Sequence, residues 1–419
     1  MKRIKMTRRQ LIEASSALGF SAAFSSIFGL AGCNSKSDSR ITAGNWREIA
    51  APAPRGSITP RVNAMADGSV ILSWLEPNDD GTAAFQFSLR REGAWSQPVA
   101  IAGRFLFSRD RASAPGVIAL SSRNLIAYWS QKPGSEEPSG NAIELFMVVS
   151  TDGESHWSLP ALVNRSAAQP GEDNGYASAA KLNDTDAAFI WLDGRNWEKD
   201  KRVQLMSRTV RANGTMSEVS LLDPDTCTCC STALVRTGSG LLAAYRGHTP
   251  ENIRDIFLIQ NRAGTWSQPR VAHPDHWHIE ACPVNGPLLD TDGSPTALIW
   301  FSAPEDQPAV KLAFSEDGGA TFAPPLRIDT GHALGRAQVM LLPNRSAVAF
   351  WLENKSGTAR LLARHIRNNA LRDEPFELSQ GGNIGYPHAA RATDGILLTW
   401  PEKDTESVSR VLVGLLRIA

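Results

Sequence analysis

Short apolar runs separated by turn residues fill the chain from residue 45 onward. Segments such as 69–74 and 84–89 have the length and composition of β-strands, and Gly, Asn, Asp and Pro punctuate them. No long segment keeps the 3.6-residue period of an amphipathic helix. The pattern therefore predicts an all-β fold.

An aromatic residue ends one apolar run in each of seven similar units. Successive marks lie 49 to 62 residues apart, which is typical of one four-stranded blade of a β-propeller. The marks are Trp74, Trp129, Trp191, Tyr245, Trp300, Trp351 and Trp400. Seven marks predict a seven-bladed propeller around a central channel. Six blades are the main alternative, followed by a two-sheet sandwich or two smaller barrels.

The last of these units is one strand short. Its final apolar run covers residues 408–416, and residues 45–49 have the pattern of the missing strand. We therefore expect the N-terminal strand to close the last blade, which leaves no exposed sheet edge in the ring. The predicted propeller domain spans residues 45–419.

The first 32 residues are typical of an export signal. A basic start is followed by an apolar stretch over residues 18–31, shorter than the roughly 20 residues that cross a bilayer, although a transmembrane anchor is the alternative. Residues 30–33, Leu-Ala-Gly-Cys, resemble a bacterial lipobox, which implies a lipid on Cys33. Residues 7–12 resemble the twin-arginine export motif. We expect a lipidated tether over residues 33–44 and a lipoprotein of the bacterial cell envelope, held at a membrane and facing the periplasm or the exterior.

The charge balance changes this picture little. Lys and Arg number 43, as do Asp and Glu, and the first 32 residues hold a net charge of +4, so the remainder is mildly acidic. With no run of basic residues, nucleic acid is not an expected partner. The 42% hydrophobic and 21% charged residues exclude a disordered or coiled-coil chain.

Two segments resemble the Asp-box of the sialidase-like (BNR repeat) β-propellers, S-x-D-x-G-x-(S/T)-(W/F). Residues 315–322 match at every defined position, and residues 150–157 are a degenerate copy with the glycine displaced by one. The matching residues are Ser315, Asp317, Gly319, Thr321 and Phe322 in the first copy, and Asp152 and Trp157 in the second. The aspartate is expected to cap hairpin amides and the aromatic to pack between sheets, so the resemblance implies a fold rather than an activity.

A sialidase of that family is expected to grip the substrate carboxylate with three arginines and to use a Tyr–Glu pair and an aspartate. Residues 55–61 do not match the family's Arg-Ile-Pro motif. If the protein is a glycosidase, the candidates for the arginine, Tyr–Glu and aspartate roles are Arg61, Arg111, Arg336, Glu172, Asp173, Tyr176 and Tyr386. Channel arginines held in salt bridges are the alternative interpretation.

Four cysteines remain beside Cys33, and all fall in the segments that enter the fourth and fifth predicted blades. Cys227, Cys229 and Cys230 should therefore face Cys282 across one blade boundary. Disulfides are one interpretation, although pairing within residues 227–230 makes a small, strained and reducible ring. A soft metal, copper or zinc, is the second, and free thiols in another role are the third.

Three histidines are candidates to complete such a metal shell: His276, His278 and His388. The i, i+2 spacing of the first two points both side chains the same way in an extended segment, but water-bonded histidines at the rim fit equally well.

The function predicted from the sequence is an envelope-anchored propeller with a Cys/His site at the channel mouth that binds a ligand or a soft metal, or responds to redox conditions. An exo-sialidase or other glycoside hydrolase is the alternative, and a protein-interaction scaffold is the third hypothesis. The partner remains open among a small molecule, a glycan and a protein, beside the membrane that the lipid on Cys33 would contact.

Overall fold

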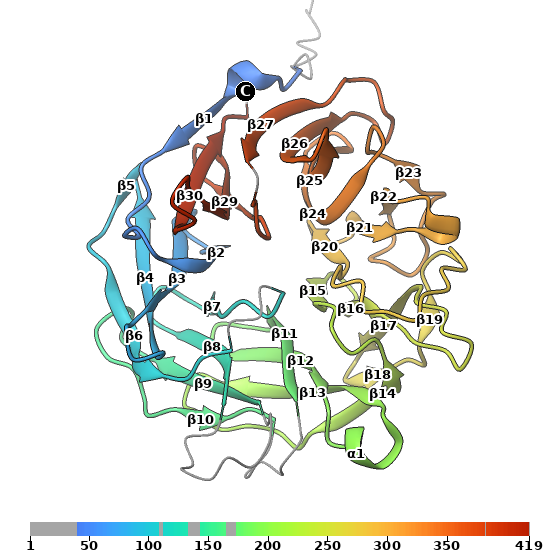
Figure 1. Ribbon diagram of the computed structural model, residues 1–419. Helices are drawn as coiled ribbons and strands as arrows, with labels where there is room; N and C mark the ends of the chain where they lie inside the picture. The colour runs from blue at the N-terminus through green and yellow to red at the C-terminus, as the bar shows by residue number, and fades with distance from the viewer. Residues whose placement is uncertain (1–39, 109–111, 133–142, 165–172, 382, 419) are drawn as a thin grey trace, which may run out of the picture. The chain divides into compact units, whose positions relative to one another are not determined.

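Seven antiparallel sheets form the fold of the protein in a computed structural model. The structure describes residues 40–108, 112–132, 143–164, 173–381 and 383–418. The first strand of each sheet contacts the first strand of the next, and the seventh sheet returns to the first, which closes a ring (Figure 1). The predicted seven-bladed β-propeller is confirmed, and six blades or a sandwich are wrong.

Blades 1 to 3 come from the first half of the described chain. Blade 1 contains β2 (Ile58–Ala64), β3 (Val70–Pro77), β4 (Ala83–Arg91), β5 (Ala94–Trp95) and β6 (Val99–Phe105). Blade 2 contains β7 (Gly116–Ala119), β8 (Leu125–Gln131), β9 (Glu144–Ser150) and β10 (Ala161–Leu162). Blade 3 contains β11 (Asn174–Lys181), β12 (Asp186–Asp193), β13 (Val203–Arg211) and β14 (Ser220–Thr226), with the short helix α1 (Trp197–Asp200) between its second and third strands.

Blades 4 to 7 complete the ring. Blade 4 contains β15 (Ala233–Thr237), β16 (Gly240–Arg246), β17 (Ile256–Arg262), β18 (Thr265–Trp266) and β19 (Arg270–Val271). Blade 5 contains β20 (Leu288–Thr291), β21 (Thr296–Ser302), β22 (Ala309–Ser315) and β23 (Leu326–Arg327), and the 3-10 turn η2 (Pro304–Asp306). Blade 6 contains β24 (Ala333–Leu342), β25 (Ser346–Lys355), β26 (Thr358–Ile366) and β27 (Phe376–Gly381). Blade 7 contains β28 (His388–Ala392), β29 (Gly395–Lys403), β30 (Ser409–Leu416) and β1 (Trp46–Ile49), which follows the 3-10 turn η1 (Ala43–Asn45).

Strand β1 closes the last blade, as the sequence predicts. It pairs antiparallel with β30, with Trp46 opposite Leu416, and the blue start of the described chain lies beside its red end in Figure 1. The Trp46 ring lies 5.9 Å from the Trp400 ring and occupies the space that a side chain at Gly414 would need. The ring of seven blades is therefore closed by main-chain hydrogen bonds between β1 and β30 and by packing of Trp46 against Trp400.

The seven aromatic marks are all buried in second strands. In five blades the indole N–H donates to a side chain two residues further on. These pairs are Trp74–Glu76 at 2.8 Å, Trp129–Gln131 at 2.6 Å, Trp191–Asp193 at 3.0 Å, Trp351–Glu353 at 2.8 Å and Trp400–Glu402 at 3.3 Å. Each pair satisfies a buried donor within one strand, because residues i and i+2 lie on the same face.

Blades 4 and 5 depart from this pairing. The acceptor position holds Gly247 in blade 4 and Ser302 in blade 5. A side chain at Gly247 would meet the ring of Phe257. In these two blades the aromatic side chain donates instead to a carboxylate outside the second strand. The Tyr245 hydroxyl donates to Asp223 at 2.5 Å, and the Trp300 indole donates to Asp275 at 2.7 Å.

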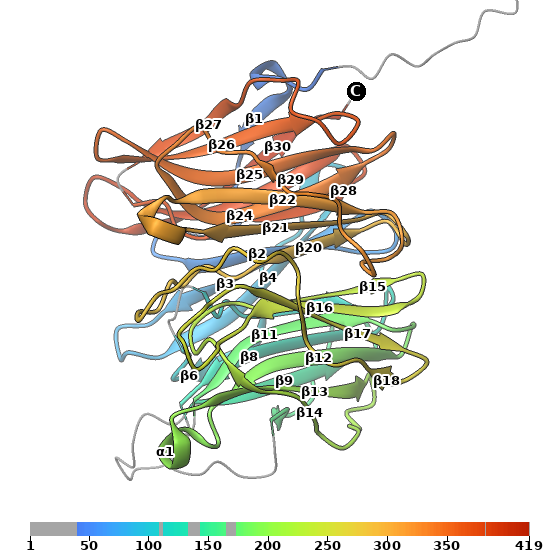
Figure 2. The ribbon, with the colours of Figure 1, turned by 90° about the vertical axis from the view of Figure 1, so that its right-hand side faces the viewer.

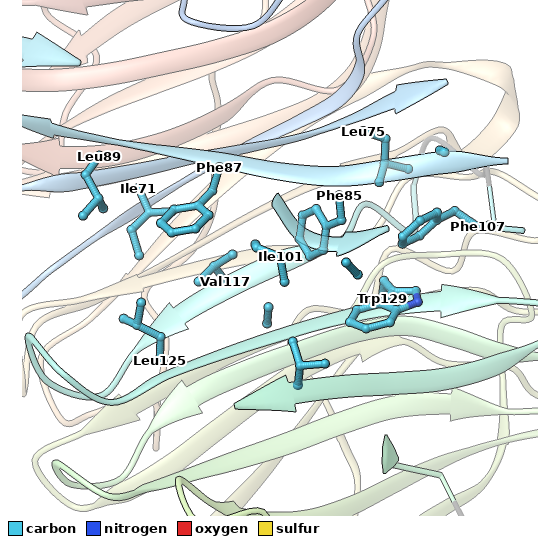
Figure 3. Packing of buried hydrophobic residues seen from close by; sticks show 14 of the residues in the cluster. Ile71, Leu75, Phe85, Phe87, Leu89, Ile101, Phe107, Val117, Leu125 and Trp129 are labelled. Atoms are coloured by element: carbon cyan, nitrogen blue, oxygen red, sulfur yellow. The ribbon is translucent and has the colours of Figure 1, made fainter. Parts of the chain in front are cut away.

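The core lies between blades, where facing sheets interleave their side chains. Between blades 1 and 2, Phe85 packs edge-on against Phe107 and Trp129, with ring centroids 6.3 Å and 6.1 Å apart (Figure 3). Figure 2 shows the sheets from the side, with strands running between the two faces of the ring. Loops on one face therefore stand on a rigid support.

The two Asp-box segments form side-chain caps at hairpins. Asp317 accepts from the amide of Thr321 at 2.9 Å and from its hydroxyl at 2.7 Å, and these bonds lower the pKa of Asp317 to about 2. In the second segment Asp152 accepts from the amide of His156 at 3.1 Å. Trp157 packs edge-on against Phe87 of the neighbouring blade, at 5.8 Å. These contacts stabilise hairpins and blade boundaries, away from the channel.

Among the described residues, no helix has the length and apolar character needed to cross a membrane. Cys33, with the predicted export signal and most of the tether, lies outside them, as do Arg111 and Glu172.

Candidate thiol site and channel mouth

Two chain segments bring four cysteines together. Cys227, Cys229 and Cys230 lie between β14 and β15, and Cys282 lies between β19 and β20. Each segment leads into the first strand of a blade, so both reach the same face of the ring. The Cys227 sulfur lies 3.9 Å from that of Cys229 and 3.4 Å from that of Cys230. The Cys282 sulfur lies 3.3 Å from the hydroxyl oxygen of Thr228.

The four thiols differ in burial. Cys227 and Cys230 are 0% and 2% exposed, Cys229 is 8% exposed, and Cys282 is exposed. Tyr176 and Val284 pack against the three buried thiols. All four thiols are free, so none of the disulfides considered from the sequence is formed among the described residues. The site is thus a buried group of three sulfurs with a fourth at its opening.

Hydrogen bonding divides the thiols into acceptors and donors. Hydrogen bonding with Cys229 and then with Cys230 lowers the pKa of Cys227, while hydrogen bonding with Cys227 raises the pKa of Cys229. Burial raises the pKa of Cys230 to about 12. The bond from Cys229, followed by that from Thr228, lowers the pKa of Cys282 to about 6. Thiolate forms at Cys227 and Cys282 are therefore favoured, and the thiolate is the form that binds metals.

The sulfur positions fit a soft metal ion. The sulfurs of Cys227, Cys229 and Cys230 all lie within 4.8 Å of one another. With metal–sulfur bonds of about 2.3 Å, tetrahedral geometry separates two sulfurs by about 3.8 Å. The group could hold a metal ion with small side-chain adjustments.

The predicted histidine ligands lie apart from this group. Within the described chain, the compact group of metal-binding side chains contains only the three buried cysteines. His276 and His278 are exposed, because the Asp255 carboxylate accepts from the amides of His276 and Trp277, each at 3.0 Å, and Trp277 turns inward. His388 lies in the channel wall instead. The structure thus supports a site of thiols rather than a mixed Cys/His shell.

The channel mouth contains a second group of candidates. Arg61, Arg336, Tyr386 and His388 line one cavity of about 60 Å³. The Arg336 guanidinium lies 4.8 Å above the Tyr386 ring and donates to the carbonyl of Ile384 at 2.7 Å. Burial, and then the charge of Arg61, lowers the pKa of His388 to about 3, so its imidazole is neutral at pH 7. The mouth therefore combines two cations with a neutral imidazole and a phenol.

Three first strands bend at this mouth in the same way. β2, β11 and β24 each contain a bulge, with Thr59, Tyr176 and Arg336 in the left-handed region at φ of 48°, 55° and 52°. Such backbone strain in residues other than glycine is concentrated at functional sites. The bulges aim side chains differently from a regular strand, which the sequence pattern could not predict.

The other glycosidase candidates are dispersed. Tyr176 packs against the thiols and not beside the arginines. Asp173 is exposed, and its carbonyl accepts from the amide of Gly194 at 3.0 Å. Among the described residues that line the cavity of Arg61 and Arg336, none is a carboxylate. The expected Tyr–Glu and Asp arrangement is not assembled there.

Residues 282–286 connect the thiols to the channel mouth. The Tyr386 hydroxyl donates to the carbonyl of Val284, whose side chain packs against the thiols. The Asn285 side-chain oxygen accepts from the amide of Arg336 at 2.7 Å. The two sites are therefore neighbours that share one segment.

Arg246, at the end of β16, was not among the site residues predicted from the sequence. Its side chain is 1% exposed, and its carbonyl accepts from the amide of Cys227 at 3.1 Å. The absent acceptor at Gly247 is the sequence signal that blade 4 departs from the others.

Comparisons with known proteins show the fold. Neither known family models nor curated proteins match this sequence. A polysaccharide lyase of family PL25, an ulvan lyase bound to -[GlcA(1-4)Rha3S]-, has a TM-score of 0.58 at 12% identity, covering 88% of this chain and 96% of that chain. A protein of unknown function from Dyadobacter fermentans DSM 18053 has a TM-score of 0.52 at 15% identity, covering 90% and 100%. A NanB sialidase mutant from Streptococcus pneumoniae has a TM-score of 0.47 at 11% identity, covering 88% and 70%.

Proposed function

We propose that the protein binds one soft metal ion, copper(I) or zinc, through Cys227, Cys229 and Cys230, with Cys282 as the fourth ligand. The observation behind this proposal is the closeness of three buried, free thiols whose sulfurs lie within 4.8 Å of one another. Thiolates select soft ions, and an all-sulfur site fits copper(I) or zinc better than a hard ion such as magnesium. The exposed Cys282 gives the ion a route to and from solvent.

Contacts among the buried thiols support this proposal over an inert packing role. A free structural cysteine packs as a small apolar side chain, whereas these thiols contact one another through their sulfurs. The two segments that hold them stand on blades 4 and 5, the two that lack the usual indole acceptor. Rigid neighbouring blades can present ligands with little loss of conformational entropy on binding.

Metal analysis of the wild-type protein tests this function. Protein purified under reducing, anaerobic conditions and incubated with copper(I) or zinc is expected to retain about one ion per chain after desalting, with the thiols protected from alkylation. Retention of no ion, with four thiols that alkylate freely or pair in disulfides, contradicts the proposal.

We also propose that the protein works at the cell envelope, anchored by a lipid on Cys33. The support is the lipobox-like segment and the export signal of the sequence. Export after folding through a twin-arginine route would allow loading with metal before translocation. Incorporation of labelled fatty acid that is lost in Cys33→Ala tests the anchor.

A second candidate function uses the channel mouth on a glycan that contains carboxylates. Arg61 and Arg336 can pair with a carboxylate, and the neutral imidazole of His388 can accept a proton beside the Tyr386 hydroxyl. The described lining lacks the two carboxylates that glycoside hydrolysis needs, so elimination fits better than hydrolysis. In that reaction His388 takes the proton from the carbon next to the carboxylate, the bond from carbon to the leaving glycosidic oxygen breaks, and a carbon–carbon double bond forms. The leaving oxygen takes up a proton from the Tyr386 hydroxyl.

Product type distinguishes the two reactions. Uronate-containing polysaccharides should give unsaturated products detected by ultraviolet absorbance, whereas fluorogenic sialosides should remain intact. Arg336→Ala is expected to abolish turnover, because the carboxylate loses its counter-charge. Release of sialic acid, or no turnover of either substrate class, contradicts this candidate.

A further inference from the structure

The position after each aromatic mark distinguishes blade 4 from the others. In the other six blades this residue is uncharged: Leu75, Ser130, Leu192, Phe301, Leu352 and Pro401. In blade 4 it is Arg246, whose side chain is 1% exposed. A fully buried arginine is rare and costly unless it is paired and hydrogen-bonded.

The hydrogen bonds of Arg246 all go to main-chain carbonyls. Its guanidinium donates to Asn285 at 3.1 Å and 2.8 Å, to Arg254 at 2.6 Å and to Phe301 at 2.7 Å. It also lies 4.8 Å from the centroid of the Trp277 ring. Among the described residues, no carboxylate lies within ion-pair distance of it. These bonds use four of its five N–H donors, and none of them goes to a negatively charged group.

The thiol segment adjoins Arg246. The amide of Cys227 donates to the Arg246 carbonyl at 3.1 Å. Val284 contacts the thiols, and the carbonyl of the next residue, Asn285, accepts two hydrogen bonds from the Arg246 guanidinium. Arg246 and the buried thiols therefore lie at the same blade boundary and share the segment that contains Val284 and Asn285.

We infer that Arg246 is a positioning residue of the thiol site, which supplies the buried positive charge that compensates the thiolates of the metal-bound state. This inference rests on the proposed metal-binding function. Three thiolates around a monovalent ion, or four around a divalent ion, give the site a net charge of −2. The Arg246 guanidinium reduces this net charge to −1. Without it, burial of the loaded site would be strongly unfavourable.

A purely structural clamp is the competing explanation, and the chain offers a matched control for it. Arg364, in blade 6, donates to the carbonyls of Asp373 and Ile328, each at 2.8 Å, and its side chain is 11% exposed. It links two blades through main-chain carbonyls, as Arg246 does, and it also lies 3.9 Å from the Glu374 carboxylate, but it is not among the residues that contact the thiols. Loss of either arginine should lower the thermal unfolding temperature.

The test compares copper(I) affinity, measured by anaerobic competition with a chromophoric chelator, in Arg246→Met, Arg246→Lys and Arg364→Met. Arg246→Met should weaken binding by about 10- to 100-fold, the range seen when groups behind metal ligands are lost. Arg246→Lys keeps the charge but not the planar fork, and it should recover most of that affinity. Arg364→Met should bind like the wild type.

Unchanged affinity in Arg246→Met overturns the inference while the proposed function stands. Equal losses in folded Arg246→Met and Arg246→Lys also overturn it, because they indicate a clamp. If Arg246→Met does not fold, folded Arg246→Lys decides: a copper(I) affinity near that of Arg364→Met supports the charge role, and a full loss of affinity overturns it. A wild-type protein that binds neither copper(I) nor zinc overturns the proposed function and this inference together.

Discussion

A Cys227→Ser variant is expected to lose stable metal binding. Cys227 is the thiol that contacts both other buried sulfurs, at 3.9 Å and 3.4 Å, so its loss removes the centre of the ligand group. A serine hydroxyl is neutral at pH 7 and is a hard donor that soft ions disfavour. Affinity for copper(I) should fall by more than about 100-fold, beyond the usual effect of groups behind the ligands. Competition with a chromophoric chelator gives the value.

Cys282→Ser is the matched control for that variant. It removes the one exposed thiol and leaves the three buried sulfurs in place. It should still hold one ion per chain, with weaker affinity than the wild type but stronger than Cys227→Ser. Thermal unfolding must show that both variants fold, because a buried hydroxyl without a partner costs about 1–3 kcal/mol. Wild-type affinity in folded Cys227→Ser would contradict the proposed site.

Trp351→Ala should cost about 3–5 kcal/mol of unfolding free energy, as is typical of large buried aromatics. Trp351 is 0% exposed and packs between blades 5 and 6. Its indole also donates to Glu353 at 2.8 Å, and that carboxylate accepts from the amide and hydroxyl of Thr330 at 2.6 Å and 2.7 Å. The change therefore leaves a cavity and weakens a buried hydrogen-bond network. Denaturant unfolding monitored by circular dichroism measures the loss.

Trp197→Ala is the control for this change. Trp197 is 37% exposed on α1, outside the blade interfaces, so its loss should change the unfolding free energy by no more than about 0.5 kcal/mol. A similar cost in both variants would contradict the role assigned to the repeated aromatics.

The fold could be predicted because its signal repeats. Each blade needs one large side chain at the same place in its second strand, so the spacing of Trp74 to Trp400 reports the number of blades. The acceptor two residues later, such as Glu76 or Glu353, is equally visible in the sequence, and it supplies a second repeated mark. Closure by β1 follows from the incomplete last unit.

The site could be predicted only in part, because its details are not periodic. Convergence of the cysteine segments follows from blade order alone. The exclusion of His276 depends on Asp255, which binds two amides of that loop, and no spacing rule anticipates this. Arg246 reads from the sequence as the start of a surface loop, and only the packing of Trp277 and three carbonyls around it shows that it is buried.

The pairing of β1 with β30 also sets an order of events during synthesis. Trp46 leaves the ribosome long before its partner Leu416, which lies far later in the chain. Pairing across such a long separation requires a costly loop closure, so it follows the local pairing within single blades. The other six blades can therefore pair before the seventh, which must wait until residues 409–416 have been made. A transcript truncated before codon 409 leaves β1 without its partner.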